Sequence, residues 1–191
     1  MTTPTTLDPR QALGRLHELT VIDVRTPGEY AGGHIPGALN IPLDQLERAL
    51  PDIRTAAQRA DVLVVCASGA RSENACRILA ENGVHTATLA GGTGAWAAHG
   101  HDLQRPEGTR KATWGMERQV RLVAGSIVLI GLALGEVVHP AFRLLSAGIA
   151  GGLVYSAVTN TCGMAAMLAR LPYNRPCKAD LDATLARLRS S

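Results

Sequence analysis

The chain has 191 residues, enough for one ordinary domain and a smaller second part. Its formal net charge is only +3 and 3% of its residues are aromatic, so we expect neither a basic nucleic-acid surface nor base stacking, and no nucleic-acid partner. The four cysteines form no Cys-x-x-Cys pair and no metal-ligand spacing, so we expect no metal and no cofactor.

The N-terminal part, to about Arg105, has the pattern of a compact α/β unit. Short apolar strands alternate with helices, which predicts a mostly parallel sheet covered on both faces. Asp8-Pro9 and Thr26-Pro27 each combine a capping residue with proline, a typical helix start. Helices are expected at Gln11–Glu18, after Thr26, at Leu43–Leu50 (ended by Pro51), at Arg71–Asn82 and around Ala95–Ala98; strands are expected at Leu19–Val24, Ala38–Ile41, Val62–Val65 and Thr86–Leu89.

Cys66 is the main candidate for a reactive residue in this unit. It ends the apolar run Val62–Val65 and opens a loop of small residues that leads to Arg71 at the start of the next helix. In parallel sheets ligands bind at the carboxyl ends of strands, where Cys66 lies. Loop N–H groups, the helix dipole and the Arg71 guanidinium are all expected to favour the thiolate form of this cysteine. We therefore predict a nucleophile in an anion-binding loop.

The composition changes after about Pro106, and two uncharged stretches follow. Leu122 to Gly135 is the first, and Leu144 to Leu168 is the second. As a helix the second would reach about 37 Å, enough to cross a bilayer core of about 30 Å. His139-Pro140 between them supplies a turn, so the pair predicts a transmembrane helical hairpin. A soluble two-helix extension that packs on the α/β domain is the alternative.

Basic residues flank both ends of this predicted hairpin, whereas its turn has only Arg143. By the positive-inside rule both ends face the cytoplasm, so we expect a multi-pass protein of the inner (cytoplasmic) membrane with a cytoplasmic catalytic domain. The absence of a signal peptide at the N-terminus agrees with a reducing compartment for Cys66. Small-residue pairs, Gly131/Gly135 and Gly148/Gly152, would allow close helix contact within the hairpin or in a homodimer.

The expected organisation has four parts. These are a catalytic domain at residues 1–105, a linker at 106–118, the membrane hairpin at 119–169 and a cytoplasmic tail at 170–191. Leu181, Leu185 and Leu188 share one face of a short amphipathic helix in this tail. That face could contact anionic lipid or the catalytic domain.

Three ordered motifs in the first half resemble those of the rhodanese (sulfurtransferase) family. The first runs from Val21 to Arg25 and continues through Glu29-Tyr30 to Gly33–Ala38. The second is the loop Cys66–Ser72, and the third is Leu89–Gly92 with Ala95-Trp96. The second half, from Glu117 to Asn174, resembles the two-helix membrane segment of bacterial inner-membrane rhodaneses of the YgaP type. The resemblance implies a three-layer rhodanese-like domain followed by the hairpin.

The resemblance also implies a sulfur-transfer mechanism of the thiosulfate sulfurtransferase type. Cys66 would take a sulfane sulfur from a donor such as thiosulfate, hold it as a persulfide and pass it to a thiol or cyanide. Cys66 and Arg71 are the expected catalytic residues. The expected substrate-binding residues, which would present N–H groups to the persulfide, are Ala67, Ser68, Gly69, Ala70, Arg71 and Ser72.

The donor is expected to depart from that of thiosulfate-specialised relatives. They often carry further cations in the loop, whereas position 70 is alanine here and Arg71 is the only charge. The physiological donor is therefore expected to be a protein or small-molecule persulfide, with thiosulfate still usable in an assay. Asp23, Arg25 and His34 also match family positions, and we interpret them as a polar network that supports the site.

Several alternatives stay open at this point. A rhodanese-like module without turnover could serve as a sensor or binding domain, although such modules usually lose the cysteine. Phosphatases of related fold have five residues between cysteine and arginine, whereas this loop has the four from Ala67 to Ala70.

The hairpin could also move a sulfur species across the membrane, and Cys162 could relay sulfur from Cys66. Cys177 has no assigned role. Cys76 is expected to pack inward.

Overall fold

The computed structural model describes residues 5–105, 116–159, 164, 167–168, 171 and 178–190. The described residues fall into two compact units, one within Met1–Thr113 together with Arg175–Ser191 and the other within Trp114–Asn174. The domain boundaries expected from the sequence remain predictions. Cys162 and Cys177, for which the sequence leaves roles open, lie outside the described residues, as does most of the second apolar stretch after residue 159.

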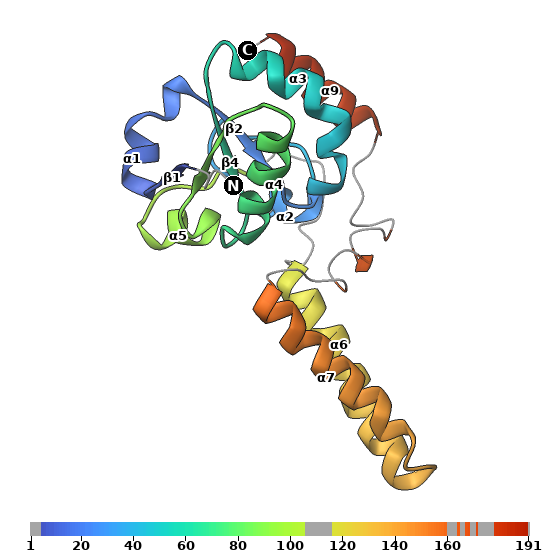
Figure 1. Ribbon diagram of the computed structural model, residues 1–191. Helices are drawn as coiled ribbons and strands as arrows, with labels where there is room; N and C mark the ends of the chain where they lie inside the picture. The colour runs from blue at the N-terminus through green and yellow to red at the C-terminus, as the bar shows by residue number, and fades with distance from the viewer. Residues whose placement is uncertain are drawn as a thin grey trace. The chain divides into compact units, whose positions relative to one another are not determined.

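The first unit is an α/β domain built on one five-stranded parallel sheet (Figure 1). Its order is β1-β5-β4-β2-β3, so the chain starts at one edge and the strand before Cys66 is central. The strands are β1 (Thr5–Leu7), β2 (Leu19–Asp23), β3 (Leu39–Asn40), β4 (Asp61–Val65) and β5 (Ala87–Leu89). The predicted parallel sheet is confirmed, and β1 is an edge strand that the sequence pattern did not indicate.

Helices cover both faces of this sheet, which gives three layers. They are α1 (Pro9–Gly14), α2 (Pro27–Ala31), α3 (Leu46–Ala57), α4 (Ala70–Glu81) and α5 (Gly92–Ala98), with short 3-10 turns η1 (Leu16–Glu18) and η2 (Leu43–Gln45). On β4, Val62 and Val64 face a core shared with α3 and α4, whereas Leu63 and Val65 face one shared with α1 and α5. This alternation is the two-residue period of a strand buried on both sides.

The sequence predicts a helix at Leu43–Leu50 that ends at Pro51, and this prediction is wrong about where the helix begins and ends. Residues 43–45 form a 3-10 turn, and α3 then runs from Leu46 to Ala57 with Pro51 inside it. Proline removes one backbone donor, but its ring is exposed and the buried stripe of Leu46, Ala49, Ile53 and Ala56 continues on both sides. Burial of Ile53 and Ala56 offsets the lost hydrogen bond. The predicted helix Gln11–Glu18 likewise divides into α1 and η1.

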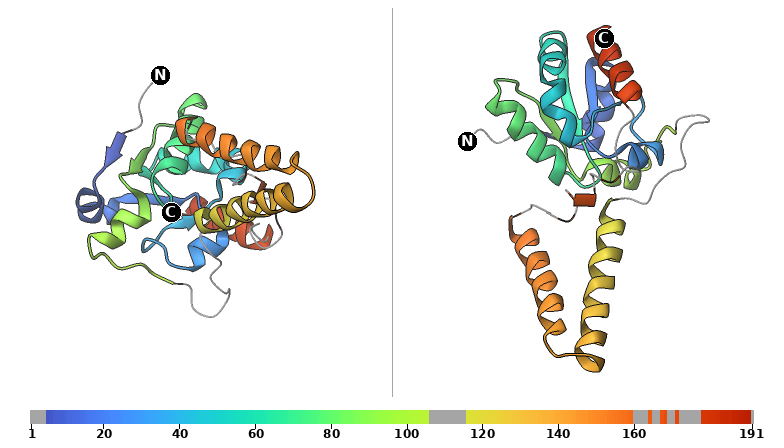
Figure 2. Two further views of the ribbon diagram at one scale, coloured as in Figure 1. Left: turned by 90° about the horizontal axis from the view of Figure 1, so that it is seen from below. Right: turned by 90° about the vertical axis from the view of Figure 1, so that its right-hand side faces the viewer.

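A helix of 13 residues, α9 (Lys178–Ser190), completes the α/β unit, although it follows the apolar helices in the chain. It lies beside α3 in both Figure 1 and the right-hand view of Figure 2. Leu181, Leu185 and Leu188 are buried in the same core as Ile53. Of the two contacts expected for this helix, with anionic lipid or with the preceding domain, the structure shows its leucine face against the α/β unit.

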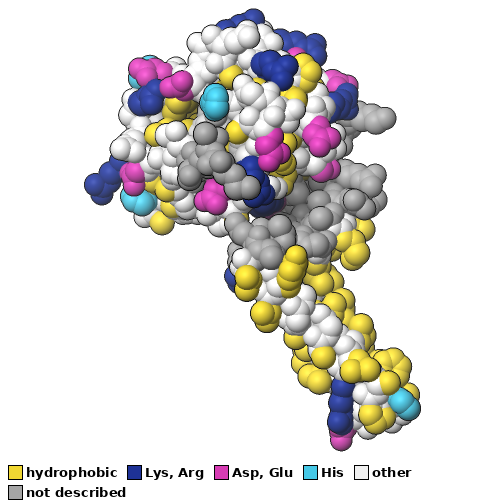
Figure 3. All heavy atoms as spheres, in the orientation of Figure 1, with side chains coloured by type: hydrophobic (Ala, Val, Ile, Leu, Met, Phe, Trp, Pro, Cys, Tyr) yellow, Lys and Arg dark blue, Asp and Glu magenta, His cyan; other side chains and the backbone are white. Residues whose placement is uncertain are grey.

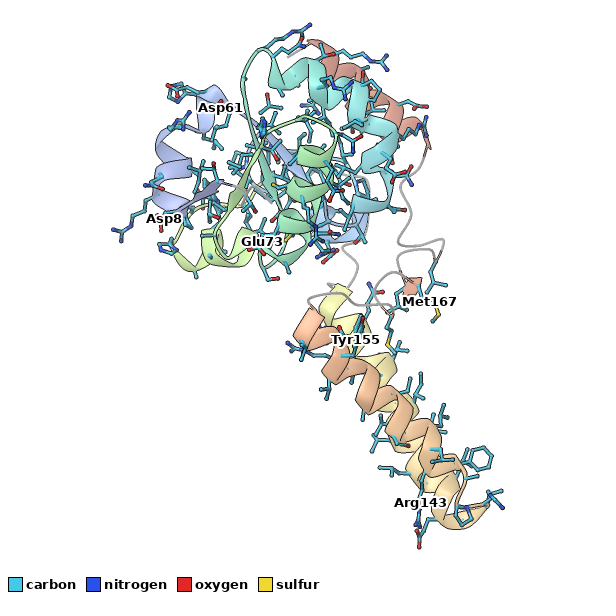
Figure 4. All side chains as sticks on the ribbon, viewed as in Figure 1. Asp8, Asp61, Glu73, Arg143, Tyr155 and Met167 are labelled. Atoms are coloured by element: carbon cyan, nitrogen blue, oxygen red, sulfur yellow. The ribbon has the colours of Figure 1, made fainter. Side chains whose placement is uncertain are left out.

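The second unit contains two antiparallel apolar helices, α6 (Met116–Val137) and α7 (Phe142–Thr159). Arg118–Val137 is long and apolar enough to cross a membrane, and Phe142–Val158 is a shorter apolar helix. Figure 3 shows hydrophobic side chains along the outside of this helix pair, as expected of a surface that faces lipid. At the turn, Arg143 pairs with Glu136, and Figure 4 shows Arg143 at the tip.

The two glycine pairs of this hairpin have different surroundings. A Cβ on Gly131 would lie 2.5 Å from Ser146 Oγ, and one on Gly135 would lie 2.5 Å from Arg143 Cγ, so the first pair allows close contact within the hairpin. Ser146 Oγ also donates to the Val128 carbonyl at 2.9 Å. Gly148 and Gly152 have no atom within 4 Å of such a Cβ, and association of two chains through them stays a prediction.

Candidate active site

Cys66 directly follows the central strand β4, and its side chain is completely buried. The Gly69 N–H donates to the Cys66 sulfur at 3.1 Å. Helix α4 begins at the next residue, so its N-terminal end lies beside the sulfur. A donated N–H and the positive end of a helix dipole both stabilise a negative charge at this position.

The first amides of α5 hold the loop from the other side. The Thr93 N–H donates to the Cys66 carbonyl at 2.8 Å, and the Gly94 N–H donates to the Ala67 carbonyl at 3.0 Å. Gly92 permits this approach, because a Cβ there would lie only 2.3 Å from the Cys66 carbonyl oxygen. The third sequence motif thus acts as a backbone support for the second.

Ser72 fixes the far end of the loop through its buried hydroxyl. This hydroxyl donates to the Gly69 carbonyl at 2.8 Å and lies 2.7 Å from the Thr88 hydroxyl on β5. Ser68 is exposed, and Ala67 and Ala70 are half-buried, so these three residues form the accessible rim of the loop. Of the predicted loop residues, Gly69 donates its N–H to the Cys66 sulfur, and the binding roles of the others remain predictions.

Arg71 is held by an acidic partner that the sequence analysis did not assign to the site. Its two terminal nitrogens donate to the two carboxylate oxygens of Glu29 at 2.9 and 2.8 Å. Burial alone would lower the pKa of Arg71, but the hydrogen bonds and charge of Glu29 outweigh it and leave the pKa raised. Arg71 is therefore a permanent cation within a bidentate ion pair.

Glu29 reaches this place because α2 follows β2, the neighbour of β4 in the sheet. The carboxyl ends of adjacent parallel strands meet at one edge, and that rule would have located Glu29 near the cysteine loop. In the sequence, Thr26-Pro27 indicates a helix start and Glu29 belongs to the first motif, and neither pattern indicates a contact with the cysteine loop. The capping box exists, with the Thr26 N–H donating to Glu29 Oε2 at 3.1 Å, and the same carboxylate also binds Arg71.

The other matched polar residues form a supporting network, as predicted. Arg25 pairs with Asp23 at 2.6 Å and donates to the Gly33 carbonyl at 2.8 Å, with both side chains buried. Asn40 donates to the carbonyls of Asp23 and Arg25 at 3.0 and 2.9 Å. His34 stacks on Tyr30, and burial lowers its pKa. These contacts fix the turn between β2 and β3 beside the loop.

Cys76 differs from Cys66 although both are buried in the same core. It lies within α4, where its thiol donates to the Ala87 carbonyl at 3.6 Å, and burial raises its pKa. A buried thiol with a raised pKa is a poor nucleophile, and its predicted inward packing is confirmed. Among the residues that the structure describes, no three His, Cys, Asp or Glu side chains gather as metal ligands would.

Each half of the chain matches a known protein family. A rhodanese-like domain model matches residues 6–99, and a model of the transmembrane domain of YgaP-like inner membrane proteins matches residues 115–178. An uncharacterized protein of Synechocystis sp. is 36% identical over 86% of this chain and 89% of its own length. A sulfurtransferase of Allochromatium vinosum is 38% identical over 51% of this chain and 90% of its own length.

A solved structure has the same fold as the first half. The rhodanese-related protein of Thermoplasma volcanium superposes with a TM-score of 0.50 at 25% identity, over 53% of this chain and 99% of that one. Helix α9 begins where the membrane-domain match ends and lies beyond the rhodanese-like match, so neither family model accounts for most of it.

Proposed function

Because this chain belongs to the rhodanese family and carries a YgaP-like membrane domain, we propose that it is a membrane-anchored sulfurtransferase with Cys66 as its nucleophile. The single observation that carries the proposal is the Gly69 N–H donated to the Cys66 sulfur at 3.1 Å. That amide and the α4 N-terminus both stabilise a thiolate.

In the first half-reaction the Cys66 thiolate attacks the outer, sulfane sulfur of the donor. A bond forms between Cys66 Sγ and that sulfur, while the donor's S–S bond breaks and its electron pair leaves with the rest of the donor. With thiosulfate the leaving group is sulfite, and with an alkyl persulfide it is a thiolate. The backbone amides from Ala67 to Ser72 then surround the sulfur that Cys66 has gained.

In the second half-reaction an acceptor thiolate or cyanide attacks the sulfur that Cys66 carries. The Cys66–sulfur bond breaks, and the thiolate is restored with its stabilising amides already in place. Since the two substrates react in turn with one residue, ping-pong kinetics are expected. Neither half-reaction needs an external oxidant or reductant.

Mass spectrometry of the full chain after incubation with thiosulfate tests this proposal. We expect a mass gain of one sulfur atom, which maps to the peptide with Cys66 and is lost when cyanide is added. The peptide with Cys76 is an internal control, since burial raises the pKa of that thiol and it should stay unmodified. A chain that gains no sulfur from thiosulfate or from a persulfide would contradict the proposal.

A second candidate function is a binding module without turnover. The observation that favours it is the complete burial of the Cys66 side chain, since a donor must reach the sulfur past the rim of the loop. The same experiment separates the two candidates. A module without turnover would keep an unmodified Cys66 under conditions in which the full chain stays folded.

We also propose that both ends of the hairpin face the cytoplasm. Helix α9 shares a core with the α/β unit that precedes the hairpin, so the two flanks of the membrane domain belong to one folded body. A segment whose two flanks belong to one body on one side of a bilayer crosses that bilayer an even number of times. This supports two crossings, by α6 and the shorter α7, and the basic flanks favour the cytoplasmic side.

Labelling of introduced cysteines tests this topology. In intact spheroplasts, a membrane-impermeant maleimide should label His139→Cys at the exposed turn but not Leu13→Cys on α1, whose side chain is 45% exposed. After permeabilisation both variants should react. The unsubstituted chain gives the background from its own cysteines. Labelling of Leu13→Cys before permeabilisation would contradict the cytoplasmic assignment.

A further inference from the structure

The loop's one formal charge is not free to attract an anionic substrate. Both terminal nitrogens of Arg71 donate to the carboxylate of Glu29, and the Glu29 side chain is only 4% exposed. A bidentate pair in a partly buried place is screened little by water. At the distance of a substrate, the Arg71 and Glu29 charges largely cancel.

The Glu29 carboxylate is positioned independently of Arg71. The Thr26 N–H and the Thr26 hydroxyl both donate to Glu29 Oε2, at 3.1 and 2.9 Å. These bonds form the capping box of α2, so the carboxylate is held by contacts that do not involve the loop. The ion pair is therefore a built feature of the site rather than a chance surface contact.

A second carboxylate, that of Glu73, lies close to the loop from the first turn of α4. A Cβ on Gly69 would be 3.9 Å from Glu73 Oε1, and Gly69 is the residue that donates to the Cys66 sulfur. Figure 4 labels Glu73 in the α/β unit, and its side chain is exposed. Among the charged side chains that the described contacts place at the loop, one guanidinium and two carboxylates leave a net negative charge.

We propose that Glu29 sets the choice of sulfur donor, so that the site favours persulfides of low charge over the dianion thiosulfate. This inference rests on the proposed sulfurtransferase function and concerns the donor of the same site. In the favoured reaction the Cys66 thiolate attacks the terminal sulfur of R–S–SH and forms Cys66–S–SH. The S–S bond of the donor breaks, R–S⁻ leaves with the electron pair, and the proton stays on the transferred sulfur.

The charge of the donor explains the preference. Thiosulfate brings two negative charges to a place whose net charge is already negative, and the thiolate that attacks it is negative as well. A persulfide such as cysteine persulfide carries less negative charge than thiosulfate when the Cys66 thiolate attacks it. Because Coulomb energies scale with the product of charges, each carboxylate near the loop penalises the dianion about twice as much as a monoanion.

Donor kinetics of the full chain in detergent test the proposal. The measured quantity is kcat/KM for thiosulfate divided by kcat/KM for cysteine persulfide. Glu29→Gln keeps the shape of the side chain and an oxygen for the Thr26 cap while it removes the charge. We expect this variant to raise the ratio by about tenfold, mainly through a lower KM for thiosulfate.

Two further variants keep the test decisive. Glu81→Gln, at the exposed end of α4 far along the helix from the loop, removes the same charge and should leave the ratio unchanged. Glu73→Gln, which alters an exposed residue, should raise the ratio by a few-fold even if Glu29→Gln fails to fold. A ratio that stays constant in Glu73→Gln and in folded Glu29→Gln would overturn the proposal.

Failure of this inference is distinguishable from failure of the proposed function. If neither donor places sulfur on Cys66, the sulfurtransferase assignment itself fails. If both donors load Cys66 but the ratio of their kcat/KM values is unchanged in Glu29→Gln and Glu73→Gln, only the proposed role of these carboxylates is wrong.

Discussion

Gly92→Ala is expected to reduce sulfur transfer by about 100-fold or more. A Cβ at this position would lie 2.3 Å from the Cys66 carbonyl oxygen and 2.7 Å from the Ala67 carbonyl carbon, both of which are backbone atoms. Relief of the clash has to move the start of the loop and lengthen the Thr93 N–H bond to Cys66. A displacement of about 1 Å at a reacting group costs rates of this order.

The backbone conformation of Gly92 adds a second cost. Its φ of +59° lies in the left-handed region, where an L side chain costs about 1–2 kcal/mol. The variant should therefore also be less stable. Steady-state assays at a temperature where the variant is folded, checked by circular dichroism, separate the loss of rate from the loss of stability.

Gly83→Ala provides a matched control for that conformational cost. Gly83 has a similar φ of +75°, but a Cβ there has no atom within 4 Å. It follows the end of α4 and so lies at the opposite end of that helix from the loop. We expect this variant to lose stability and keep its rate. If Gly92→Ala and Gly83→Ala had equal rates, the support of the loop by α5 would be unimportant for transfer.

The position of Cys66 was predictable because the signals for it are local. An apolar run rich in valine indicates a buried strand, small residues indicate a loop, and Arg71 begins a stretch that is expected to be helical. Each signal spans a few residues, and their order alone places the cysteine at a strand end beside a helix start. The structure adds the exact donor, Gly69, and the support from Thr93 and Gly94.

The partner of Arg71 was harder to predict because it is distant in sequence. Glu29 has a complete local explanation as the third residue of a capping box, and nothing in that motif requires a second role. Only the pairing of β2 with β4 brings Glu29 to Arg71. The sequence around Glu29 therefore indicates its local role in the helix cap but not its contact with the distant Arg71.

The extent of α3 and the docking of α9 were missed or left open for a related reason. Proline is a strong helix breaker by propensity, but the leucine and isoleucine stripe around Pro51 packs against the sheet and against α9. The stability of α3 and that of α9 depend on each other, because the apolar side chains of each helix are buried against the other. Such tertiary effects cannot be read from either segment alone.

Leu188→Ala is expected to destabilise the catalytic domain although Leu188 lies more than a hundred residues after Cys66 in the chain. The Leu188 side chain is completely buried in the core shared by α3, α4 and the sheet. Truncation of a buried leucine typically costs about 2–5 kcal/mol. In hydrogen exchange of the full chain in detergent, amides of α3 should therefore exchange faster by roughly 30-fold or more.

Asp182→Ala on the same helix separates this packing from surface charge. Asp182 pairs with Arg48 at 2.7 Å, but the two side chains are 59% and 49% exposed. An exposed pair of this kind contributes at most about 1 kcal/mol, so exchange at α3 should change by less than about fivefold. Equal protection in both variants would mean that α9 rests on the domain without stabilising it. Strong loss in Leu188→Ala alone would instead make the last helix a structural part of the catalytic domain, and the argument for an even number of membrane crossings depends on that result.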